Sequence, residues 1–337
     1  WLLVIKKLFI FKFEFVVFMY YSSIILAFVF VFLLSAISTA ILDIVFRFLG
    51  KRGFLGNLYP NVRGGIPRAV GLVPFIILSF YLLPGYNTLV LIIGIFAFID
   101  DIVGRRKIHS LGIEWGQLSR GLGILIVIAA GFIEGLGISS IFIALLVQPL
   151  NIADMQPGSA CMVTMIMSIL TAIVMIFVGV APIYGIPAEY TPLLVFVVCL
   201  AYSPLDFLGK IMLGEVGNHT FGVALGISFY LIGGTWWLIL FFILTTLLTA
   251  FVRRSTLKVF FRQQLRLLDP AFGDFVMDVL TGGGLGDLFR RLILKDKQYN
   301  VTNPLLVSLG FRRLLFNPYA PHPRSYISNK PKLKLGE

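Results

Sequence analysis

The chain has 337 residues, of which 58% are hydrophobic and 13% are charged, and its formal net charge is +12. Soluble globular domains are about half apolar and about a quarter charged, so this composition excludes a water-soluble domain and a disordered chain. The apolar runs are also longer than the alternating strands of an outer-membrane barrel allow. We therefore expect an all-α, polytopic helical membrane protein with about 9–10 transmembrane helices.

The first segment, residues 1–21, is an apolar and basic extension. It begins at Trp1 rather than at a methionine, and Met19 is an alternative start. Charged residues among its aromatic side chains favour an interfacial helix over a full span. The alternative for residues 1–18 is that they are not native to the protein. No small-residue cleavage site follows a short apolar core, so a signal peptide is not expected.

Residues 22–254 form the predicted multi-span core. Its apolar stretches cover residues 22–46, 69–83, 86–99, 118–133, 136–150, 161–180, 191–204, 220–233 and 235–252. Several of them are shorter than the about 20 residues that a span needs, so we extend them into their flanks. Turn residues such as Pro84-Gly85 and Gly233-Gly234 separate neighbouring stretches.

The remainder of the chain changes in character after the last of these stretches. Residues 255–300 predict a cytoplasmic amphipathic segment, because apolar residues recur at helical spacing among basic ones. Glycines at 282–284 predict a hinge rather than a phosphate loop, since no lysine follows at the required place. Residues 301–337 hold an apolar stretch and a basic tail. A last, tenth span is left open there, because Arg312 and Arg313 interrupt the apolar stretch 301–316.

Basic residues assign a side of the membrane to each loop. They concentrate in the loops 47–68 and 100–117 and at Arg253-Arg254, which alternation of the spans places on one side. The positive-inside rule makes that side cytoplasmic, and we expect an integral protein of the cell membrane. The same rule explains most of the net charge, so nucleic acid is not an expected partner.

Several acids fall on the cytoplasmic side, at or just beyond the ends of spans. They are Asp100, Asp101, Asp154, Asp206 and Glu215. An acid at the membrane edge is costly unless it is hydrated, paired or bound to a cation. Oxygen donors favour Mg²⁺ or Mn²⁺ over zinc. The histidines at 109, 219 and 322 lack metal-ligand spacing and are expected in loops, while Cys161 and Cys199 are expected as small apolar residues within spans.

Four segments carry the motifs that point to a function. Residues 63–71 read Arg-Gly-Gly-Ile-Pro-Arg-Ala-Val-Gly, and residues 98–101 read Phe-Ile-Asp-Asp. Residues 151–154 read Asn-Ile-Ala-Asp, and residues 210–218 read Lys-Ile-Met-Leu-Gly-Glu-Val-Gly-Asn. In this order, the stretch 45–255 resembles the polyprenyl-phosphate N-acetylhexosamine-1-phosphate transferases, a family that includes the phospho-N-acetylmuramoyl-pentapeptide transferases. These enzymes load a sugar phosphate onto a lipid phosphate carrier.

The resemblance implies an Mg²⁺- or Mn²⁺-dependent transferase whose site opens to the cytoplasm. It would move N-acetylhexosamine-1-phosphate from a UDP-sugar to polyprenyl phosphate and release UMP, for cell-envelope polysaccharide or glycoprotein glycan assembly. A homodimer is left open as its assembly. The family's motif positions correspond here to catalytic Asp100, Asp101 and Asp154, to the metal ligands Glu215 and Asp101, and to the substrate-binding residues Arg63, Asn151, Lys210, Asn218, Arg253 and Arg254.

The chain departs from the family's pattern at five places, one of which is Gln148, where another asparagine is common in the family. Glu215 stands where the family has aspartate, and Asn218 stands where it has serine. Pro157 replaces an aspartate associated with the nucleotide base, and the family's histidine-rich loop is missing, with Arg253 and Arg254 in its place. These departures leave an alternative from another class: a relative without chemistry that binds or transports lipid phosphates.

Overall fold

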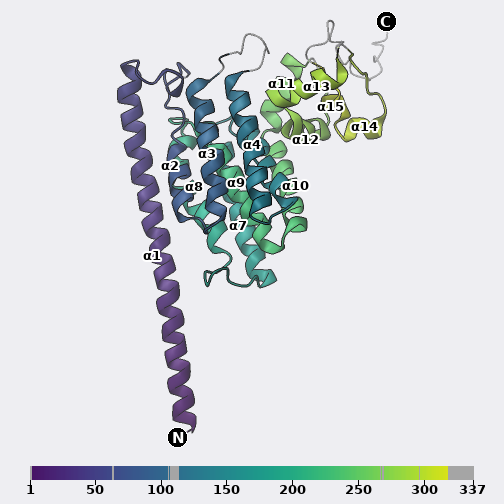
Figure 1. The fold of residues 1–337 in the computed structure, drawn as a ribbon. Helices are drawn as coiled ribbons and strands as arrows, with labels where there is room; N and C mark the ends of the chain where they lie inside the picture. The colour runs from purple at the N-terminus through teal and green to yellow at the C-terminus, as the bar shows by residue number, and fades with distance from the viewer. Residues whose placement is uncertain are drawn as a thin grey trace, which may run out of the picture.

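The computed structural model describes residues 2–62, 64–104, 106, 114–265, 267, 269–295 and 297–317. Within these residues every regular element is a helix, so the fold is all-α (Figure 1). The elements are α1 (Leu2–Lys51), η1 (Gly56–Leu58), α2 (Leu72–Tyr81), α3 (Tyr86–Val103), α4 (Trp115–Ile133), α5 (Ser139–Leu145), α6 (Val147–Ala153), α7 (Ser159–Val178), α8 (Tyr190–Phe207), α9 (Gly214–Gly233), α10 (Thr235–Val252), α11 (Arg254–Gln264), α12 (Phe272–Thr281), α13 (Gly284–Leu294), α14 (Pro304–Ser308) and α15 (Phe311–Leu314).

Helices long and apolar enough to cross a bilayer identify a polytopic membrane protein. Six in the described chain qualify: α1 over Ser23–Lys51, α3, α4, α7, α8 and α10. The α2 helix and the α5–α6 pair are apolar but shorter. The α9 helix has 20 residues and is not among the six. Each of the nine predicted apolar stretches therefore contains a helix, although fewer helices have the length and composition of a full span than the sequence suggested.

The structure adds detail at both ends of the chain. The α1 helix continues from Leu2 to Lys51, so no break marks the expected boundary after residue 21. The tenth span is absent from the described part of residues 301–337, where α14 has 5 residues and α15 has 4. A helix needs about 20 residues to cross the bilayer. The amphipathic segment is confirmed as helical, and its glycine break lies between α12 and α13.

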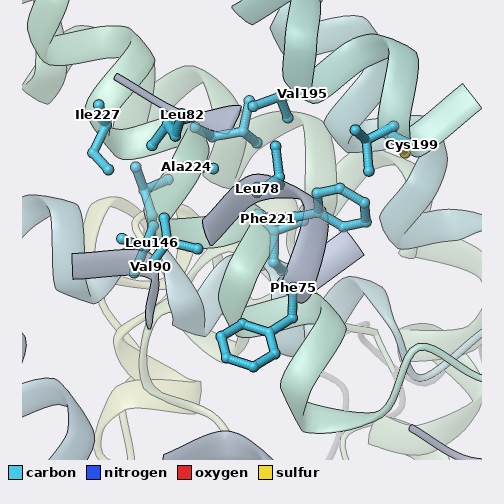
Figure 2. Close-up of a cluster of buried hydrophobic side chains, with 14 of the residues drawn as sticks. Phe75, Leu78, Leu82, Val90, Leu146, Val195, Cys199, Phe221, Ala224 and Ile227 are labelled. Carbon is cyan, nitrogen blue, oxygen red and sulfur yellow. The ribbon is translucent and has the colours of Figure 1, made fainter. Parts of the chain in front are cut away.

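The α9 helix lies at the centre of the bundle and carries the fourth motif. Of its 20 residues, 17 are buried, and it packs against α2, α3, α5, α6, α7, α8 and α10. Figure 2 shows Phe221 and Ile227 of α9 among buried side chains such as Leu78 of α2 and Val195 of α8. Because protein surrounds it on all sides, α9 tolerates glycine and polar residues that a lipid-facing helix would exclude.

The first motif is packed against the start of α9. The backbone N–H of Gly71 donates to the carbonyl oxygen of Leu213 at 3.2 Å, just before α9 begins. A Cβ atom on Gly71 would overlap that oxygen and the backbone of Gly217. Only glycine allows this approach, so residues 67–71 are held at the N-terminal end of α9.

We expect Gly71→Ala to destabilise the protein by about 1–3 kcal/mol, because overpacking forces the backbone apart. Thermal unfolding of the purified chain in detergent measures this effect. Gly121→Ala on α4 is the matched control, since a Cβ there meets no atom within 4 Å. Equal melting temperatures for the two variants would contradict the close approach.

The helices α11–α15 gather at one end of the bundle, where α3 ends and α4 begins (Figure 1). Phe261 of α11 and Phe275 and Val279 of α12 share an apolar core with Ile152 of α6 and Ala250 of α10. Two ion pairs tie α15 to α12: Arg313 to Asp278, and Arg312 to Asp274 at 2.7 Å. The C-terminal segment is therefore a packed cap on the end of the bundle that also holds the motif residues.

Candidate functional site

Asp101, near the C-terminal end of α3, is fully buried and caps α9 from outside that helix. Its Oδ1 accepts a hydrogen bond from the backbone N–H of Glu215, and its Oδ2 accepts one from Val216, each at 3.0 Å. Arg68 places Nε 3.0 Å from the same Oδ1. The first N–H groups of a helix lack partners within the helix and attract anions. Asp101 therefore fixes the start of α9, and with it the position of Glu215.

Asp100 is turned towards α4. Arg120 Nη2 lies 3.0 Å from Asp100 Oδ2 and 2.8 Å from Glu215 Oε1, so one guanidinium joins acids from α3 and α9. Gly116, one turn before Arg120, lies so close to Asp100 that a Cβ would overlap Oδ1. The absence of a side chain at residue 116 thus makes room for the carboxylate.

Glu215 contacts more charged groups than either aspartate. Besides Arg120, it has Arg68 Nη2 3.7 Å from Oε1 and His219 Nε2 3.2 Å from Oε2. His219 is fully buried one turn further along α9, so the expectation that it lies in a loop is wrong. We call Asp100, Asp101, Glu215, Arg68, Arg120 and His219 together the ion cluster.

Asp154, from the third motif, lies beside the ion cluster. Asn218 donates from Nδ2 to Asp154 Oδ2 at 3.4 Å, which joins the third motif to the fourth. Burial, followed by the charge of Asp206, raises the pKa of Asp154 well above its usual value. Asp154 therefore favours the protonated form at pH values where an exposed aspartate is ionised.

Asp206, the remaining acid of the predicted set, accepts hydrogen bonds at the start of α7. Its Oδ2 accepts from the backbone N–H of Gly158 at 3.1 Å and from Cys161 Sγ at 3.2 Å. The two cysteines are buried and free, as small apolar residues within helices would be. Asp206 thus connects α8 to the loop that follows Asp154.

The predicted substrate-binding residues differ in their burial and in their contacts. Asn151 is half-buried on α6, Lys210 and Arg254 are exposed, and Arg63 lies outside the described residues. Arg253 is buried at the end of α10, where its Nη1 donates to Gln156 Oε1 at 3.4 Å, and burial lowers its pKa. The structure thus joins Asn218 to Asp154, while the exposed side chains of Lys210 and Arg254 make no described bond to the ion cluster.

A cavity of about 730 Å³ opens between the bundle and the C-terminal cap. Its wall begins at Gly121, the residue after Arg120, and continues through Leu125 and Phe289. Gln148 and the buried Arg290 are among the few polar residues that line it. It is a mostly apolar space with a few polar groups, which is the form that small-molecule sites in proteins usually take.

Sequence reasoning missed three members of the ion cluster. Arg68 was counted only as a basic loop residue, although it lies within the first motif. Arg120 stands inside an apolar stretch, and a lone charge there is a recognised sign of an internal partner. His219 follows Glu215 by four residues, which places both on one face of a helix.

The expected Mg²⁺ or Mn²⁺ ligands are already paired with groups of the protein. Both oxygens of Asp101 accept backbone N–H groups, Asp100 Oδ2 contacts Arg120, and both oxygens of Glu215 face cationic or imidazole nitrogens. Across the described ranges, no group of three or more His, Cys, Asp or Glu residues is arranged to hold a metal ion. In this arrangement the donor set does not fit a divalent cation.

Comparison with known proteins assigns no family to the chain. No model of a protein family matches the chain, and no curated protein matches it.

Proposed function

We propose that this protein is a sugar-1-phosphate transferase that acts on a polyprenyl phosphate at the cytoplasmic face of the cell membrane. One observation carries the proposal: acids from three motifs meet although they are far apart in the sequence. Asp101 binds the backbone of Glu215, and Asp154 contacts Asn218. Four ordered motifs resemble those of the transferase family, and this resemblance implies the expected substrates, a UDP-sugar and the lipid carrier.

The reaction brings anionic groups together. An oxygen of the lipid phosphate attacks the β-phosphorus of the nucleotide sugar, the bond from that phosphorus to the bridging oxygen breaks, and UMP leaves. Positive groups must neutralise the phosphate oxygens as they approach one another. Arg68 and Arg120 are placed to do so, and both are held by carboxylates that keep them from turning away.

The protein's other groups take roles that their contacts support. Asp101 is a positioning residue, because its oxygens are used to hold the start of α9. The mostly apolar 730 Å³ cavity between α4 and the C-terminal cap would take isoprene units of the lipid. The buried Oδ1 of Asn218 has no described hydrogen-bond partner, so it is an acceptor that a donor on the nucleotide sugar could fill.

The identity of the released nucleotide tests the reaction type. The purified chain is incubated with polyprenyl phosphate and a panel of radiolabelled UDP-sugars, and nucleotides and lipids are separated by chromatography. We expect UMP together with a lipid diphosphate sugar. Release of UDP would overturn the proposal, because it signifies attack at the sugar carbon.

A second candidate is a protein that binds or transports lipid phosphates without chemistry. The paired state of Asp100 and Glu215 favours it, since each carboxylate of the ion cluster is paired with an arginine. Intact donor across the whole panel, combined with saturable binding of polyprenyl phosphate, would support this candidate against the transferase.

A further inference from the structure

The α13 helix exposes apolar side chains and buries a charged one. Phe289, Leu292 and Ile293 are 62%, 64% and 75% exposed, whereas Arg290 is buried and donates from Nη1 to Thr281 Oγ1 at 3.0 Å. Residues three and four apart lie on one face of a helix, so the three exposed side chains form one apolar surface, which we call the α13 stripe. A helix surrounded by water has the opposite arrangement, with its charged side chains outside. The α13 stripe therefore indicates an apolar environment outside the protein.

The cavity between α4 and the C-terminal cap gives the depth of this stripe. Phe289 and Ile293 line it together with Gly121 and Leu125 of α4, a helix long and apolar enough to cross a bilayer. With a rise of about 1.5 Å per residue, Gly121 and Leu125 lie about 9 Å and about 15 Å along α4 from its first residue. The hydrocarbon core is about 30 Å thick, so these two residues lie at the depth of the lipid chains. The α13 stripe therefore adjoins hydrocarbon rather than water.

The wall of the cavity is continuous with the surface that the bundle presents to lipid. Leu125 of α4 is 62% exposed and Leu145 of α5 is 39% exposed, and both line the cavity. Hydrocarbon chains of neighbouring lipids match such a mostly apolar space, because they supply the dispersion contacts that its side chains otherwise lack. The cavity is thus accessible from the side, through the bilayer.

The charge around the α13 stripe also fits a lipid surface. Residues 284–300 contain four basic and two acidic residues, and the basic Arg291, Lys295 and Lys297 are exposed. An apolar face next to basic residues is typical of helices that lie in the interface of an anionic membrane. A second copy of this chain would bring the same positive charge against the helix, which opposes association. The charge therefore favours anionic lipid over a second copy.

We propose that α13 is an interfacial helix that inserts the α13 stripe into the leaflet beside the C-terminal cap, with anionic lipid headgroups against its basic residues. In this position α13 and α4 form the two sides of a lateral opening, and a lipid chain from the leaflet fills the cavity between them. The inference does not rest on the proposed function, because any lipid of the leaflet has the required chemistry.

A nitroxide spin label on Ile293→Cys tests the depth of the α13 stripe. The full chain, with alanine in place of Cys161 and Cys199, is placed in lipid nanodiscs that contain phosphatidylglycerol. Collisions of the label with oxygen, which concentrates among lipid chains, are compared with collisions with a nickel complex, which stays in water. We expect the oxygen-to-nickel accessibility ratio at residue 293 to be several-fold above that of the control.

Gln263→Cys is the matched control, because Gln263 is an exposed polar residue on α11 of the same C-terminal cap. A ratio at residue 293 equal to or below that at residue 263 would place the stripe in water and overturn the proposal. Protection of residue 293 from both reagents would also overturn it, because it signifies a protein partner such as a second copy.

The lipid composition tests the charged part of the interaction. Nanodiscs of phosphatidylcholine alone lack the anionic headgroups, so we expect a lower oxygen-to-nickel ratio at residue 293 than with phosphatidylglycerol. An unchanged ratio would contradict the anionic partner.

A photo-cross-linking experiment keeps the test available if the chain without cysteines does not fold. The photoreactive residue p-benzoylphenylalanine replaces Phe289 in the chain that retains both cysteines, and mass spectrometry identifies the products of irradiation in the same nanodiscs. We expect adducts with lipid at residue 289 and several-fold fewer when the photoreactive residue replaces Gln263. Cross-links between two copies of the chain, or equal lipid adducts at both positions, would overturn the proposal.

Discussion

Glu215→Gln is expected to lower the rate of UMP release by about a thousandfold, or about 4 kcal/mol in the transition-state barrier. Glu215 is the acid that both arginines and His219 contact. A neutral amide of the same size keeps the shape of the site but loses the charge that orients these groups. The phosphate oxygens would then meet cationic side chains that are no longer held in place.

The measurement is the initial rate of nucleotide release, under saturating polyprenyl phosphate and the best donor sugar of the panel. Glu189→Gln is the matched control, because Glu189 is also partly buried but lies at the start of α8, outside the ion cluster. It should retain full activity. Normal turnover by Glu215→Gln would refute the role given to Glu215, even if the protein proved to be a transferase.

Asp101→Asn is expected to destabilise the folded protein by about 3 kcal/mol, the lower end of the cost of breaking a buried ion pair. The carboxylate is fully buried, and it accepts from two backbone N–H groups while it is paired with Arg68. Asparagine has one acceptor oxygen, so it leaves an N–H of α9 and the arginine without their partner.

Thermal unfolding in detergent reports this loss as a fall in melting temperature. Asp43→Asn makes the same chemical change at the i,i+4 pair between Asp43 and Arg47, whose side chains are 15% and 32% exposed. Helical i,i+4 pairs contribute about 0.3–0.5 kcal/mol, so this partly exposed control should melt close to the unaltered chain. Equal melting temperatures for Asp101→Asn and Asp43→Asn would show that Asp101 is not the structural cap of α9.

The sequence predicted the membrane class and the positions of the core helices because the apolar stretches are long enough to determine them. It did not predict that α1 is continuous from Leu2, because the charges near its start resemble the end of a span. It also did not predict the small number of full-length spans, since burial within the bundle allows α2 and the α5–α6 pair to be short.

The candidate site was partly predictable for a similar reason. Motif spacing and the side assigned to each loop placed Asp100, Asp101, Asp154 and Glu215 together, and the structure brings them together through Arg120, Asn218 and the backbone of α9. Arg120 was not predicted because its pairing across helices cannot be inferred from one chain's linear order, whereas the pairing of His219 with Glu215 lies within α9 and follows from their spacing of four residues. Pairing across helices also turns Asp101 from an expected metal ligand into a cap.

The central position of α9 has a consequence for motion. Helices pack against it on all sides, and Gly71 lies so close to Gly217 that a Cβ atom on Gly71 would overlap the Gly217 backbone. A close-packed interior does not let a helix slide or rotate without moving its neighbours. Glu215 and Asn218 therefore project from a close-packed helix, so that a rearrangement around them would move side chains rather than α9 itself.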